Sequence, residues 1–175
     1  MPRMTRCQFI VALLALCSCA EIAAQATSAV TTTLTVAGNV AQSLTLTVAD
    51  LKRYPARDIE YAPELGADHK PSAEPARRYT GCLLRDVLAA AKPIEHKPRE
   101  LRRSYVVATA SDGYEVVFSW AELFVSPVGD NVFVVYERDG APLQDDEGRI
   151  ALIVITDYRP VRHVKWLQTL TLRAA

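Results

Sequence analysis

The stretch Tyr105-Val-Val-Ala-Thr-Ala-Ser-Asp-Gly-Tyr-Glu-Val-Val-Phe-Ser119 is the part of the sequence that best indicates the fold. Two apolar runs rich in β-branched and aromatic residues, 105–110 and 114–119, flank an Asp-Gly pair. Such a pair favours a tight turn, because glycine tolerates the positive φ that hairpin turns require. We therefore predict an antiparallel hairpin that turns at Gly113.

The sequence after this hairpin predicts more strands and one short helix. Ser119-Trp-Ala-Glu122 has the spacing of a capping box, so a helix should begin there. Strands are expected over 132–137 and 150–155, and the second is apolar throughout, which indicates burial on both faces. The segment His163–Arg173 alternates between apolar and polar residues and predicts a last strand.

The sequence before the hairpin also predicts short strands and short helices. We predict strands over Thr33–Val36 and Ser43–Thr47, a short helix capped by Thr47, a long irregular loop over 62–78 and a helix over 81–91 with one apolar face. Strands and short helices in this irregular order predict an α+β domain with mixed β-sheets. They do not fit a Rossmann-like repeat.

Composition sets limits on the class of protein. The chain has 175 residues, of which 50% are apolar and 23% charged, enough to fill the core of one ordinary domain. The formal net charge is zero, which argues against a nucleic-acid-binding protein, where a basic surface is typical.

The N-terminus has the layout of a secretory signal peptide: a basic start, a short apolar run and small residues. We predict that residues 1–26 are removed after Ala26, that residues 27–175 form the mature domain, and that the protein is periplasmic. The apolar run is too short to cross a bilayer. A second interpretation is a lipoprotein modified on Cys19. Among the four cysteines, only Cys82 would remain after cleavage at Ala26, which leaves no intramolecular disulfide.

Several segments together resemble a known family. They are Leu34–Gly38 with Leu46–Leu51, Tyr79–Leu88, Ala110–Glu115, Arg138–Leu143 and Arg162–Leu167. In this order they cover nearly all of residues 33–172 and resemble the molybdopterin-binding domain of the sulfite oxidase family. The most specific segment, Arg162-His-Val-Lys-Trp-Leu167, is similar to the family's C-terminal pterin-contacting motif.

The resemblance implies a sulfite oxidase-like fold, molybdopterin as the cofactor to consider, and a set of cofactor-binding residues: Asp112, Arg162, His163, Val164 and Lys165. On the predicted last strand, His163 and Lys165 would emerge on the same face, about 6.6 Å apart. Together with Arg162 they could hold a phosphate, a pterin or another small anion. The alternatives are a polar strand face open to solvent and, for Asp112, a residue chosen for its turn.

The sequence also departs from the family. Family enzymes ligate molybdenum through a cysteine between the first helix and the motif that matches Tyr79–Leu88, and no cysteine stands in that segment here. Cys82 matches a small apolar position of the family. Glu147 and Leu152 stand where the family tends to have a histidine and an arginine. We therefore predict no metal ligand and no catalytic residue.

Three functions are compatible with these features. The first is an exported ligand-binding or accessory protein with a degenerate cofactor site and no intrinsic redox catalysis. The second is a periplasmic molybdopterin-dependent oxidoreductase that passes electrons to a membrane or periplasmic redox partner. The third is a structural or interaction module whose pocket is plugged by side chains.

Overall fold

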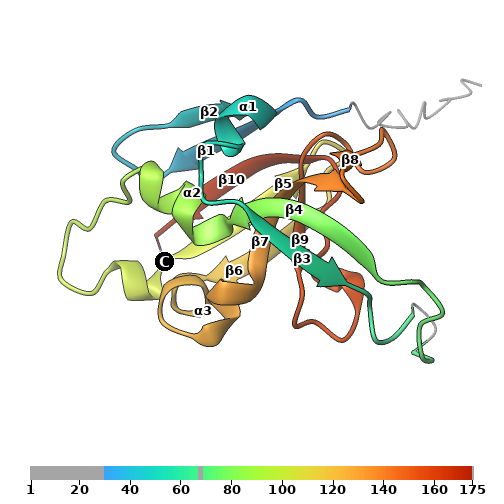
Figure 1. Cartoon of the computed structure of the whole chain (residues 1–175). Coiled ribbons are helices and arrows are strands. Elements are labelled where there is room, and N and C mark those ends of the chain that lie inside the picture. Colours follow the sequence, from blue (N-terminus) through green and yellow to red (C-terminus); the bar gives the residue numbers. More distant parts are fainter. Residues whose placement is uncertain (1–29, 67–68, 175) are drawn as a thin grey trace, which may run out of the picture.

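Two five-stranded sheets make up most of the molecule (Figure 1). The structure is a computed structural model that describes residues 30–66 and 69–174. The predicted signal peptide and Cys19 therefore lie outside the described residues. Among the residues described, no helix has the length and hydrophobicity needed to cross a membrane.

The first sheet has the strand order β2-β1-β10-β5-β6. Its strands are β1 (Thr33–Gly38), β2 (Leu44–Thr47), β5 (Tyr105–Ala110), β6 (Glu115–Ser119) and β10 (Leu167–Arg173). β1 pairs parallel with β10, whereas the other neighbours are antiparallel. The predicted mixed sheet is thus confirmed. The hairpin of β5 and β6 turns through Gly113 at φ +88°, as its sequence indicated.

The second sheet has the order β3-β4-β7-β8, with β9 also paired to β7. Its strands are β3 (Arg57–Tyr61), β4 (Arg77–Leu83), β7 (Val132–Arg138), β8 (Ala141–Pro142) and β9 (Ala151–Val154). All four residues of β9 are buried, as its continuous apolar sequence predicted. Figure 1 shows β3 and β4 as a long hairpin that reaches away from β1 and β2.

The helices are short and join the two sheets. They are α1 (Val48–Leu51), α2 (Leu84–Ala90) and α3 (Trp120–Phe124), with 3-10 turns at Leu101–Arg103, Pro127–Asn131 and Pro160–Arg162. Thr47 caps α1 in a capping box with Asp50, and Ser119 caps α3 with Glu122. Both caps were predicted from the sequence.

The second sheet is apolar on both faces. One face joins the first sheet and α2 in the larger core, which contains Cys82 and Leu152. The opposite face carries a smaller cluster that includes Ile59, Tyr61 and Tyr79. This smaller cluster lies beside the site described below.

Two sequence predictions were wrong. The last strand begins at Leu167 and not at His163, because Trp166 adopts a left-handed backbone (φ 49°) that turns the chain just before the strand. The helix predicted over 81–91 begins at Leu84, and residues up to Leu83 belong to β4. Apolar residues spaced as on a helix face serve equally well in a buried strand, so this boundary was ambiguous in the sequence.

Candidate functional site

A pocket of about 350 Å³ lies between the β3–β4 hairpin and the segment that precedes β10. Tyr61 ends β3, Tyr79 lies in β4, Arg138 ends β7, and His163 and Lys165 precede β10. The rest of the lining consists of Pro63, Glu74, Pro75, Arg77, Glu147 and Pro160. Segments distant in the sequence therefore meet at one concave surface.

His163 and Lys165 both line this pocket. They flank Val164, which is fully buried and pairs with Leu152 through two backbone hydrogen bonds of 2.9 Å. Because neighbouring side chains alternate across such a bridge, the residues on either side of Val164 turn toward the pocket. The sequence predicted that both residues lie on a regular strand. In the structure, the isolated bridge at Val164 places their side chains on the same side.

The His163 ring lies between two tyrosines. Its centroid is 6.4 Å from that of Tyr61 and 6.4 Å from that of Tyr79, and both contacts are edge-to-face. Its Nε2 atom is buried and has no hydrogen-bond partner among the described residues. Burial, with added repulsion from Lys165 and Arg138, lowers the pKa of His163 to about 4. The imidazole is therefore neutral at pH 7, with one N–H to donate and one lone pair to accept.

Glu147 is a buried carboxylate in the wall of the pocket, 3% exposed. Its Oε2 accepts a 2.7 Å hydrogen bond from Nη1 of Arg138, and its Oε1 accepts one of 3.2 Å from the hydroxyl of Tyr79. Burial and the nearby Glu147 charge raise the pKa of Tyr79 to about 12, so the phenol stays protonated. Tyr79, Arg138 and Glu147 thus form one connected polar cluster.

The other predicted site residues lie elsewhere. Arg162 donates two hydrogen bonds to Asp157 and one to Glu122, and its hydrogen bonds with Asp157 raise its pKa. Asp112 is exposed, and its carboxylate accepts a 2.9 Å hydrogen bond from the Tyr114 amide within the hairpin turn. The structure therefore brings together His163 and Lys165, supports them through Val164, and leaves Arg162 and Asp112 outside the pocket.

One comparison identifies the family, and a second one identifies the fold. The model of the oxidoreductase molybdopterin binding domain matches residues 21–175. The chain belongs to this family. Among solved structures, it is similar to the sulfane dehydrogenase SoxCD from Paracoccus pantotrophus, with a TM-score of 0.63 and 21% sequence identity. The match confirms the sulfite oxidase-type fold. It covers 82% of this chain but 39% of the SoxCD chain, so the protein spans about two-fifths of that length. No curated protein matches the sequence.

The described residues of this family member do not form the thiolate site that the resemblance implies for molybdenum enzymes. Within the described residues, no group of three or more His, Cys, Asp or Glu side chains could hold a metal ion. Cys82 is fully buried in the core between the sheets, whereas Tyr79 of the same strand belongs to the opposite face. Burial raises the pKa of the Cys82 thiol to about 12, which keeps it protonated at neutral pH.

The residues of this pocket suit the anionic part of a ligand better than they suit a metal ion. Arg77, Arg138 and Lys165 bring positive charge to the pocket, and the His163 ring offers a neutral polar group beside them. Lys165 is exposed and makes no hydrogen bond or ion pair with any residue in 30–66 or 69–174. Its ammonium group is available for a ligand.

Sequence reasoning missed Tyr61, Tyr79 and Arg138 as lining residues. Tyr61 and Tyr79 lie on the same face of the β3–β4 hairpin, two residues out of register from each other. The motifs around Tyr79 and Arg138 were quoted for their likeness to the family, but a pairing of β3 with β4 was not predicted. Without that pairing, nothing in the sequence brings these residues to His163.

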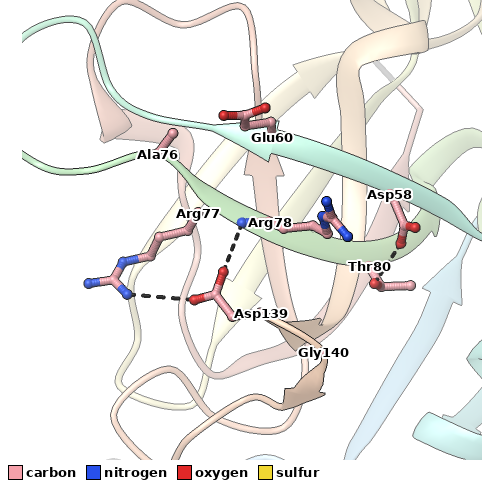
Figure 2. A pocket seen from close by; sticks show the side chains of 8 residues that line it. All are labelled: Asp58, Glu60, Ala76, Arg77, Arg78, Thr80, Asp139 and Gly140. Carbon is pink, nitrogen blue, oxygen red and sulfur yellow. Dashed lines mark hydrogen bonds and ion pairs between the residues drawn. The ribbon is translucent and has the colours of Figure 1, made fainter.

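A second and larger pocket, of about 500 Å³, lies on the outer side of the β3–β4 hairpin (Figure 2). Two of its charged groups pair with each other: Asp139 forms an ion pair with Arg77 and also accepts a hydrogen bond from the Arg78 amide. Asp58 accepts a hydrogen bond from the hydroxyl of Thr80. Most of its lining residues are exposed. Since it holds no buried polar group awaiting a partner, we place the site at the pocket of His163.

Proposed function

We propose that this family member is an exported protein that binds a small anionic ligand in the pocket of His163 and Lys165. It acts as a binding or accessory protein and carries out no molybdenum redox catalysis of its own. The observation that carries this proposal is the convergence of the buried imidazole and the unpartnered ammonium on one concave surface.

The chemistry of the donors supports the binding half of the proposal. A neutral imidazole donates one N–H to an anion without its own charge having to be desolvated, and Lys165 supplies the attraction from the rim. Tyr61 and Tyr79 form apolar walls that reduce the competition from water.

The donor set supports the non-catalytic half. Molybdenum in this family is anchored by a thiolate, as the resemblance implies, and the one described thiol lies in a different core. Export is supported by the basic, apolar and small-residue order of the N-terminal residues. The partner is then a small anion, and not a nucleic acid.

Anion binding is tested by NMR titration of the purified protein with methanesulfonate, sulfate and inorganic phosphate at constant ionic strength. We expect saturable shifts of the His163 and Lys165 amides with at least one of these anions. Lys165→Gln and His163→Gln should weaken binding about tenfold, the loss expected for a charged or polar ligand contact. Lys97→Gln, at another exposed lysine, is the matched control and should bind as the wild type does. Equal binding by all three variants would refute the site.

The absence of redox catalysis is tested by metal analysis. Protein purified from a host that makes molybdopterin should contain molybdenum far below one atom per chain. Stoichiometric molybdenum, together with visible absorption bands that bleach on reduction, would establish the oxidoreductase instead.

A further inference from the structure

The ion pair of Arg138 and Glu147 determines how much positive charge the pocket can offer. Glu147 engages Arg138 with one carboxylate oxygen and Tyr79 with the other. The pair is well shielded, with side-chain exposures of 21% for Arg138 and 4% for Glu147. The guanidinium therefore meets its counter-ion inside the protein before any ligand arrives.

The backbone holds Glu147 in this position. Its carbonyl accepts a 2.7 Å hydrogen bond from the Trp166 amide, and its own amide donates one of 3.0 Å to Gln144. Gly148, which follows, has φ +78°, and a Cβ at that position would lie 2.9 Å from Cα of Trp166. The turn is thus packed against the segment that carries His163 and Lys165, and the backbone of Glu147 is held in place.

The formal charges of the lining leave a small positive excess. Of the three basic side chains, Arg138 pairs with Glu147 and Arg77 pairs with Asp139, so Lys165 carries the one positive charge of the lining that has no ion-pair partner among the described residues. His163 adds none, because it is neutral. A monoanion balances this charge, whereas a dianion leaves an excess negative charge beside the buried Glu147 carboxylate.

We propose that Glu147 makes this pocket selective for small monoanions, such as a sulfonate or a carboxylate, over dianions such as sulfate. The inference rests on the proposed anion-binding function and names its ligand class. Glu147 already balances the charge of Arg138, so this guanidinium attracts a second negative charge of the ligand less strongly. A dianion also loses more hydration on entering the pocket, and only a second free cation could compensate for that loss.

The wild-type protein provides the first test. In NMR titrations at pH 7.5 and constant ionic strength, methanesulfonate should bind more tightly than sulfate, two probes of similar size that differ by one charge. Equal or tighter binding of sulfate by the wild type would overturn the inference without any variant.

Two variants then test Glu147 itself. Glu147→Gln keeps the size of the side chain and frees Arg138, so the affinity for sulfate relative to methanesulfonate should rise about tenfold. The double variant Arg138→Gln/Glu147→Gln removes both charges, restores the net charge of the lining, and should return the ratio to the wild-type value. Glu74→Gln, in an exposed loop of the same pocket, is the matched control; it removes a carboxylate without releasing Arg138 and should change the ratio less.

The outcomes separate the two proposals. If no anion binds any of these proteins, the anion-binding function fails. If both anions bind but the ratio stays the same in Glu147→Gln, the pocket binds anions and Glu147 does not select among them.

Discussion

Arg162 holds Asp157 through two hydrogen bonds, 2.8 Å from Nε to Oδ2 and 2.5 Å from Nη2 to Oδ1. The same guanidinium reaches Glu122 of α3 at 3.3 Å and lies 5.2 Å from the ring centroid of Phe118. These contacts join the turn before His163 to the first sheet. Arg162 thus helps to position the ligand segment from outside the pocket.

We therefore expect Arg162→Gln to reduce stability and not ligand affinity. The free energy of unfolding should fall by about 2 kcal/mol, because the half-buried Asp157 carboxylate loses charged hydrogen bonds. Chemical denaturation measures the loss, and an NMR titration measures the affinity. Arg53→Gln, which removes an 80% exposed arginine, should leave stability nearly unchanged. A stable Arg162→Gln protein that no longer binds anions would place Arg162 in the site after all.

Local chemistry explains which parts of this molecule could be predicted from the sequence. The turn at Gly113 and the caps at Thr47 and Ser119 depend on residues a few positions apart, so their patterns are visible in the chain. The left-handed conformation of Trp166 is stabilised by hydrogen bonds to the loop that contains Glu147. This contact joins residues about 20 positions apart, so no local sequence pattern predicts it.

The candidate site was predictable to the extent that its residues are close in sequence. His163 and Lys165 form part of one motif and share one pocket. Arg162 belongs to the same motif, but its side chain pairs with Glu122 and Asp157 and lies outside the pocket. Glu147 was noted as a departure from the family, but its role depends on Arg138 and Tyr79, which only the paired strands of the second sheet bring to it.

Stability should fall in mild acid because of His163. Its pKa is about 4 in the folded protein against an ordinary value of 6.5, so the unfolded chain binds more protons between these values. This component of stability is complete above pH 6.5 and is lost as the pH falls toward 4, by about 3 kcal/mol in total. Denaturation series at pH 7 and pH 4.5 should show a larger loss for the wild type than for His163→Gln.

NMR titration of the imidazoles checks the same point directly. We expect the His163 resonances to stay unchanged until the pH approaches 4. A midpoint near 6.5 would show that His163 is not held neutral by burial. It would also contradict the predicted loss of stability in mild acid.

Cys82 should be inert in the folded protein. The thiol is fully buried, and burial raises its pKa to about 12, so almost no thiolate forms at pH 8. Iodoacetamide should leave the Cys82 peptide unmodified under native conditions and alkylate it fully in denaturant, as mass spectrometry of the digest will show. Rapid native alkylation would mean that the core between the sheets opens readily, or that the thiol is available as a ligand.

Gly81 is the position at which β4 can least accept a side chain. A Cβ there would lie 2.3 Å from the carbonyl oxygen of Val134 and 2.8 Å from Cα of Val135, both backbone atoms of the adjacent β7. The register between the two strands shifts at this point, between Thr80 and Gly81. Since β4 carries Tyr79 and β7 carries Arg138, Gly81→Ala should separate the two partners of Glu147 as well as the strands. We expect a loss of about 3 kcal/mol in the free energy of unfolding and weaker anion binding in whatever folds.

Gly113→Asn is the comparison for Gly81→Ala. Gly113 has φ +88°, nothing lies within 4 Å of a Cβ built there, and asparagine tolerates this left-handed conformation better than most residues. The hairpin variant should lose less than about 1 kcal/mol and keep the affinity of the wild type, because the strain is local and the β4–β7 contact is untouched. Denaturation curves and anion titrations of the two variants side by side decide the matter. A Gly81→Ala protein as stable as Gly113→Asn would show that β4 and β7 can move apart at little cost, and the polar cluster of Tyr79, Arg138 and Glu147 would not be the fixed wall that selectivity for monoanions requires.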